Sequence, residues 1–184
     1  MNKIKVLSLS IVLLLAFQHA GAQRYISKNG HVWFYSHTPL EDIEARNNQV
    51  VSILDVPTGT IQFSLLIKSF EFRIALLEEH FNENYMESDQ FPKADFTGKI
   101  SNLDKIDFSQ NGNYTAVVNG DLTIHGVTKN LSVPGTLEVK DGKIIARAQF
   151  IVKPQDFDIE IPSVVEDKIA REIEVNVDLT YNPN

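Results

Sequence analysis

After its first 22 residues, the sequence places apolar residues at every second position through most of its length. Residues 113–125, 61–67 and 173–180 all show this alternation with polar residues. Successive side chains of a β-strand point to opposite faces, so a period of two predicts strands with one buried face. Further strands are predicted at His31–Ser36, Gln49–Asp55, Ala94–Ser101, Leu131–Val139 and Ile144–Val152.

Short turn motifs separate these strands. Asp141-Gly142 lies between two alternating runs and predicts a tight hairpin. His125-Gly126, Asn111-Gly112 and Pro57-Thr58-Gly59 mark other turns. A parallel strand pair needs a crossover of about a dozen residues or more, and the gaps here are too short for one. The sheet is therefore predicted to be antiparallel.

One segment follows a different period. In Phe72–Tyr85 the apolar residues recur at helical spacing, and Glu78, Glu79 and Glu83 lie on the opposite side. This pattern predicts one short amphipathic helix that lies against the sheet or across an end of it.

About eight strands of this length can close into a barrel with room inside for side chains or one small ligand. The sequence thus predicts an all-β fold, an antiparallel up-and-down β-barrel of about eight strands with one short amphipathic helix. A sandwich of two sheets would show the same alternation, and the pattern alone leaves that alternative open.

Residues 1–22 have the three parts of a secretory signal peptide. A basic start with Lys3 and Lys5 precedes an apolar run over 6–17 and the small residues Ala20-Gly21-Ala22. The apolar run is shorter than the ~20 residues of a membrane-spanning helix. We therefore expect cleavage near Ala22, a mature domain of residues 23–184 without an integral membrane segment, and a periplasmic or secreted protein.

The mature chain is acidic and has no cysteine. Removing Lys3 and Lys5 from the 17 basic residues leaves 15 against 24 acidic residues, a formal charge of −9. Nucleic acids and anionic membranes attract positive charge, so we expect neither as a constant partner. Without cysteine, neither a disulfide nor a lipid-modified cysteine is available, and stability must come from the apolar core.

Several segments are similar to a known family. The run 119–129 (NGDLTIHGVTK) resembles a hairpin motif of YceI-like proteins. Upstream of it, 84–96 resembles the family's helix exit, and downstream 156–159 and 167–179 resemble its D-F-G-I segment and its last strand. The resemblance implies a lipocalin-like barrel that holds a long-chain apolar lipid, such as a polyisoprenoid, in its lumen and has no catalytic role.

The sequence contains no catalytic or metal-binding motif of the common kinds. His31, His37, His80 and His125 lack the paired spacing of zinc ligands. His125 precedes a glycine at a turn, and we interpret it as a hydrogen-bonding turn residue. There is no nucleophile motif, P-loop or dinucleotide fingerprint. We therefore expect no catalytic residue, no metal and no cofactor.

The alternation identifies candidate ligand contacts on the inward faces of the strands. Trp33, Phe34 and Tyr35 are three successive rings, and either Trp33 and Tyr35 or Phe34 could lie at the barrel mouth. We take Trp33 and Tyr35 as candidates. The other candidates are Ile61, Phe63, Leu65, Ile67, Ala116, Val118, Leu122, Ile124, Ala148, Phe150, Val175 and Val177.

Small residues in these inward sets favour a hollow lumen over a packed one. They are Ala116, Gly120, Gly135, Ala146 and Ala148. The alternative is a filled barrel that serves as a module for protein or cell-surface interactions without a lipid, and a homodimer stays open in either case. An enzyme that acts on a lipid is disfavoured, since the sequence offers no nucleophile–base pair.

The N-terminal pattern makes a direct prediction. Protein recovered from its source cell should begin at or near Gln23 and carry no covalent lipid. N-terminal sequencing and intact mass check this, and an intact Met1 in the functional pool would contradict it.

Overall fold

The computed structural model describes residues 23–184, and the predicted signal peptide lies outside this range. The predicted strands are all present, and those near the N-terminus are longer than the sequence pattern indicated. The strands are β1 Arg24–His37, β2 Asp42–Asp55, β3 Thr60–Leu66, β4 Phe70–Phe72, β5 Lys93–Ile100, β6 Gly112–Ile124, β7 Val127–Lys140, β8 Lys143–Val152 and β9 Ile173–Pro183.

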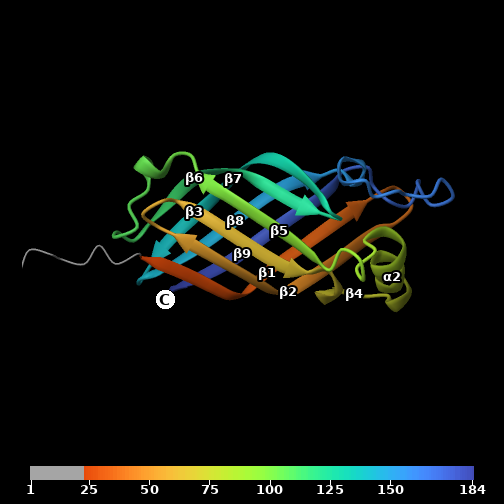
Figure 1. The fold of residues 1–184 in the computed structure, drawn as a ribbon, viewed down its shortest axis with the longest axis horizontal. Helices are drawn as coiled ribbons and strands as arrows, with labels where there is room; N and C mark the ends of the chain where they lie inside the picture. Colours follow the sequence, from red (N-terminus) through yellow and green to blue (C-terminus); the bar gives the residue numbers. More distant parts are fainter. Residues whose placement is uncertain (1–22) are drawn as a thin grey trace, which may run out of the picture.

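Eight of these strands close into an antiparallel barrel (Figure 1). Apart from the short β4, each strand pairs with its neighbours in sequence, and β1 pairs with both β2 and β9. The β1–β9 ladder is what closes the sheet, with Val32 opposite Val177 and Phe34 opposite Val175. The up-and-down barrel is therefore confirmed, and the sandwich alternative is excluded.

Two hairpins use the tight turns that the sequence predicts. His125 and Gly126 have φ values of 51° and 75°, and Asp141 and Gly142 have values of 52° and 76°. Positive φ at both central residues is the mark of the two-residue turn whose twist matches that of the flanking strands. The glycine occupies the second position each time, where a side chain would be strained.

The helical segment is shorter than predicted. Phe72 belongs to β4, which pairs with β2, so the helix α2 begins only at Ala75 and runs to His80. A π-helical turn over Phe81–Tyr85 continues it. Phe72 fits the helical spacing although it lies in β4. Its ring packs on the turn that follows α2, with 5.0 Å between the ring centroids of Phe72 and Phe81.

The helix lies across one end of the barrel (Figure 1). The β1–β2 turn, the β6–β7 turn and the long β8–β9 connection reach the same end, which we call the mouth end. The C-terminus lies at the opposite end (Figure 1), which we call the base.

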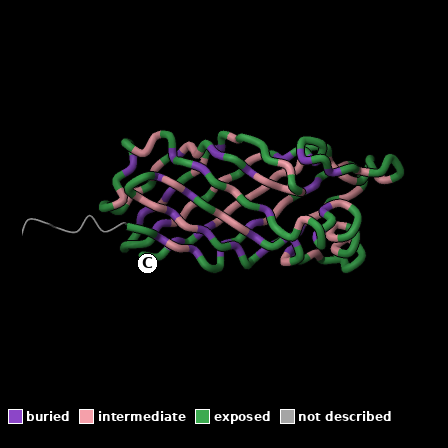
Figure 2. The backbone as a smooth tube through the Cα atoms, in the orientation of Figure 1, coloured by how far each residue is buried: buried purple, intermediate pink, exposed green. Residues whose placement is uncertain are grey.

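The interior is tightly packed toward the base. Leu54, Val50, Ile144 and Tyr181 are fully buried, and buried positions alternate with exposed ones along the strands (Figure 2). Within residues 23–184, no helix has the length and apolar character needed to cross a membrane.

One polar pair is buried in this packed region. The Ser52 hydroxyl donates to the carbonyl oxygen of Gln62 over 2.8 Å, so the Tyr181 hydroxyl must donate to Ser52 Oγ over 2.7 Å. Burial raises the pKa of Tyr181 to about 12, against the opposing effect of the Ser52 hydrogen bond. The phenol therefore stays protonated and remains a donor at neutral pH.

This pair predicts unequal effects of two substitutions. Ser52→Ala leaves the buried Tyr181 hydroxyl without its acceptor and should lower the free energy of unfolding by about 1–3 kcal/mol. Tyr181→Phe keeps the Ser52–Gln62 bond and should lower it by about 1 kcal/mol or less. Urea unfolding of both variants measures the difference.

The double variant supplies the control. Because Ser52→Ala with Tyr181→Phe removes both hydroxyl groups of the pair, the double variant should be more stable than Ser52→Ala alone. If the two single substitutions lowered the free energy of unfolding equally, and the double variant lost the sum of the two, the assignment of donor and acceptor would be contradicted.

Candidate functional site

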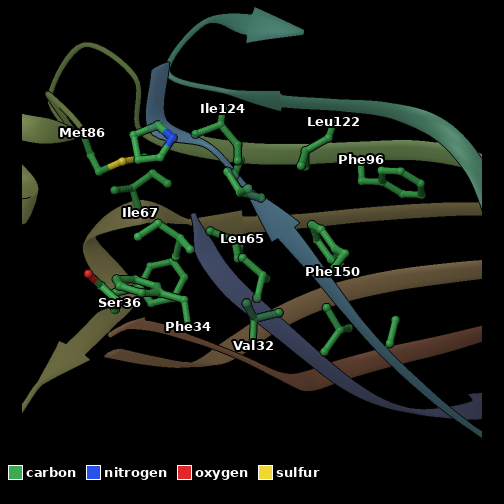
Figure 3. Close-up of a pocket in the computed structure, with 18 of the residues that line it drawn as sticks. Val32, Phe34, Ser36, Leu65, Ile67, Met86, Phe96, Leu122, Ile124 and Phe150 are labelled. Atoms are coloured by element: carbon green, nitrogen blue, oxygen red, sulfur yellow. The ribbon is translucent and has the colours of Figure 1, made fainter. Parts of the chain in front are cut away.

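The mouth half of the barrel encloses a cavity of about 590 Å³ (Figure 3). This volume lies within the range of small-molecule pockets, roughly 300–1,000 Å³. All strands of the barrel contribute, and the lining is almost entirely aliphatic and aromatic. Twelve of the fourteen predicted contact residues line it, namely Ile61, Phe63, Leu65, Ile67, Ala116, Val118, Leu122, Ile124, Ala148, Phe150, Val175 and Val177.

The other two predicted residues, Trp33 and Tyr35, do not line the cavity, and Phe34 does so in their place. Val32 and Ser36 are buried and share the inward face of β1 with Phe34, as Figure 3 shows. Tyr35 is 37% exposed on the outer face. Three rings in a row fit either register of the alternation, so the sequence did not decide between them.

Three neighbouring strands turn only small side chains inward at one level of the barrel. Ala116 of β6 lies opposite Gly135 of β7, and Gly135 lies opposite Ala148 of β8. All three line the cavity. A filled lumen needs bulky side chains at every level, and these three small residues instead border the cavity, which favours a hollow lumen.

A pair of glycines makes room for a large ring at the wall. Gly98 of β5 lies opposite Gly120 of β6, and a Cβ atom on Gly120 would lie 2.7 Å from Cζ of Phe96. The ring of Phe96 therefore lies down over the glycine pair and adds an aromatic surface to the lining (Figure 3).

Helix α2 and the β8–β9 connection cover the mouth, and both supply lining residues that the sequence did not identify. From α2 and the turn that follows come Leu77, Phe81 and Met86, and from the connection come Val165 and Ile169. The amphipathic pattern of the helix could have indicated the first group. The connection has no periodicity, so nothing in the sequence indicated the second.

Among residues 23–184, four acidic or basic side chains border the cavity, and all but Arg147 of β8 come from segments at the mouth. Glu41 lies in the β1–β2 turn, His80 ends α2, and Lys168 lies in the β8–β9 connection. The connection is tied to the barrel where the Ala170 N–H donates to the buried Ser36 Oγ over 2.8 Å. A ligand inside would meet apolar groups along most of its length, with charged groups at the mouth and Arg147 at the β7–β8 seam.

His125 forms hydrogen bonds at the mouth end rather than inside the cavity. Its Nδ1 lies 3.2 Å from the carbonyl oxygen of Phe157, and its Nε2 lies 2.9 Å from a carboxylate oxygen of Glu87. The ring of Phe91 packs on it with a centroid separation of 4.4 Å. The sequence analysis expected His125 to close its own turn by hydrogen bonding, whereas these two hydrogen bonds join the β6–β7 turn to two other segments.

No cluster of three or more His, Asp or Glu side chains suited to a metal ion occurs within residues 23–184.

The fold matches solved structures over most of its length. A polyisoprenoid-binding domain from Saccharophagus degradans superposes with a TM-score of 0.74 at 14% identity, covering 89% of this chain and 99% of that one. Burkholderia cenocepacia BcnA gives 0.65 at 16% identity, with 82% and 95% covered. The Campylobacter jejuni YCEI protein gives 0.57 at 18% identity, with 91% and 88% covered. No curated protein sequence matches.

The comparison with protein families agrees with the hairpin motif found in the sequence. A family model described as the YceI-like domain matches residues 25–181, which is nearly the whole barrel. The chain belongs to the YceI-like family.

Proposed function

We propose that this protein binds a long apolar lipid of the polyisoprenoid type in the hollow half of its barrel and carries or sequesters it. The observation that carries the proposal is the cavity of about 590 Å³ with its apolar lining. Membership of the YceI-like family supports it, as does the structural similarity to a domain described as polyisoprenoid-binding.

The lining explains how such a ligand would be held. Each Å² of apolar surface removed from water contributes about 25 cal/mol. A chain buried over most of its length therefore gains enough for tight binding without a polar contact. The ligand would lie with its apolar tail toward Leu137 and Tyr181 at the floor of the cavity and its polar end beside Glu41, His80 and Lys168 at the mouth.

A binding role fits the lining better than a catalytic one. Among the described residues that border the cavity, the Ser36 hydroxyl accepts a hydrogen bond from the backbone N–H of Ala170, and the Tyr181 hydroxyl is bonded to Ser52. The hydroxyls of Tyr85 and Thr136 also border the cavity. None of these four hydroxyls has a histidine or carboxylate partner among the hydrogen bonds of the described residues. Catalysis by a nucleophile needs such an adjacent base.

The proposed place of action is the periplasm or the exterior of the cell, on the strength of the signal-peptide pattern in residues 1–22. A polyisoprenoid leaves a membrane only if its apolar surface is shielded from water, and a barrel with an apolar lumen provides that shield.

Native mass spectrometry of protein purified from its own host tests the proposal directly. We expect a complex of one chain with one apolar molecule, released by organic solvent and with the mass of an isoprenoid lipid. Protein that carries no lipid, and that takes up none when offered a polyisoprenoid alcohol, would contradict it.

Substitutions at the small residues test where the lipid lies. Ala148→Phe or Ala116→Leu should fill the cavity and weaken lipid binding by about tenfold or more, while the protein still folds, because a hollow site tolerates added volume better than a packed core. Fluorescence titration with retinol measures binding, and circular dichroism measures folding.

Gln62→Phe is the matched control, since Gln62 is exposed on the outer face of β3 and should leave binding unchanged. If Ala148→Phe unfolds the protein while the wild type binds no lipid, the interior is better described as a packed core.

A further inference from the structure

The seam between β7 and β8 is paired over only part of its length. Its ladder runs from Lys140 opposite Lys143 to Gly135 opposite Ala148 and ends there. Strand β7 nevertheless extends back to Val127, where it stays paired with β6. Strand β8 extends on to Val152, where it stays paired with β9. Within the described barrel, the two strands thus separate toward the mouth end while each remains part of the sheet.

Pro134 explains why the ladder stops at this point. Its partner on β6 is Val117, whose N–H donates to Asn102 Oδ1 and whose carbonyl oxygen accepts from the Ser101 N–H. Val117 therefore makes its backbone hydrogen bonds away from β7, and the backbone nitrogen of Pro134 faces β8. The next pair, Pro134 with Gln149, would need an N–H at this nitrogen, and proline has none.

The cavity extends to the gap that this leaves. Leu131 and Val133 of β7 and Phe150 and Val152 of β8 border the cavity on the two sides of the gap. Thr136 and Arg147 also border it, although both are exposed residues that lie opposite each other on the last paired part of the seam. The lining of the cavity thus includes both inward and outward residues of this one seam.

The gap is closed on its far side, which makes it a window. There the Nδ1–H of His125 donates to the carbonyl oxygen of Phe157, and Phe157, in the short helical turn Pro154–Phe157, is 2% exposed. Ile151, on β8 beside the gap, keeps 48% of its surface exposed. The lip of the window is therefore partly apolar on the outside as well.

We propose that this window between β7 and β8 is a side entrance through which the apolar chain of the ligand enters and leaves the cavity. The inference rests on the proposed lipid-binding function. At the mouth, α2 and the β8–β9 connection both border the cavity, and the Ser36–Ala170 hydrogen bond ties the connection to β1. A linear chain could pass through the window without any movement of α2 or of the β8–β9 connection.

Cross-linking the two sides of the window tests this proposal. Ser132 and Gln149 are exposed residues on opposite sides of the gap, and the chain has no native cysteine. Ser132→Cys with Gln149→Cys, joined by a short bismaleimide, should narrow the window. The control is Lys140→Cys with Lys143→Cys, joined in the same way across the paired part of the seam.

The readout is stopped-flow fluorescence with retinol, an isoprenoid probe. The window cross-link should slow both association and dissociation by about tenfold or more, with little change in Kd, and the control cross-link should leave the rates unchanged. Unchanged rates with the window cross-linked would overturn the side entrance and leave the lipid-binding function intact. Failure of the unmodified protein to bind retinol or a polyisoprenoid would overturn both.

A single substitution provides an independent test. Pro134→Val restores the N–H at the end of the ladder, so the strands should pair further toward the mouth. We expect retinol exchange to slow by several-fold and the amide at position 134 to be protected from hydrogen exchange. Protection of that amide without a slower exchange of retinol would overturn the proposal.

Discussion

Strands β6, β7 and β8 turn Ala116, Gly135 and Ala148 inward, so their backbones put no side chain larger than a methyl group into the lumen at these positions. In a closed sheet, alternate residues have no direction to point except inward, so their sizes decide how much of the lumen is empty. Toward the base, Leu54, Ile144 and Tyr181 fill the same space completely. The difference between these two sets of side chains creates a cavity with a floor, and the other properties of the site depend on it.

The strands form the wall of the cavity, and the connections lie at its mouth. The wall belongs to one continuous antiparallel sheet, whose ladders hold the apolar lining in fixed positions. The cover consists of α2 and the β8–β9 connection, which side-chain bonds such as Ser36–Ala170 and His125–Glu87 attach to the barrel. An apolar wall that is continuous around the barrel suits a ligand that is recognised by its shape and its lack of polarity.

The alternation, with the turn motifs between its runs, was sufficient to predict an antiparallel all-β fold, two tight hairpins and the inward faces of β6, β8 and β9. It left the choice between a barrel and a sandwich open, which the β1–β9 pairing decides. It was weaker near the N-terminus, because β1 has irregular pairing between Ser27 and Val32 and because buried polar residues such as Ser36 and Asn47 interrupt the apolar pattern. The register of Trp33-Phe34-Tyr35 was set by pairing with β2 and β9, which periodicity does not encode. The segments at the mouth of the cavity and the unpaired part of the β7–β8 seam depend on contacts between distant parts of the chain, which periodicity does not encode. Pro134 is the one residue whose type indicates where the seam stops pairing.

The most direct test of the account is to map which methyl groups touch a bound isoprenoid. In methyl-labelled protein saturated with unlabelled retinol, intermolecular nuclear Overhauser effects should appear at Ala116, Ala148, Leu65 and Val175, which line the cavity. They should be absent at the packed Val50 and Leu54 and at the outward-facing Leu66 and Val51. Contacts confined to the outer-face methyl groups, with none at Ala116 or Ala148, would contradict the claim that the lipid lies inside the barrel.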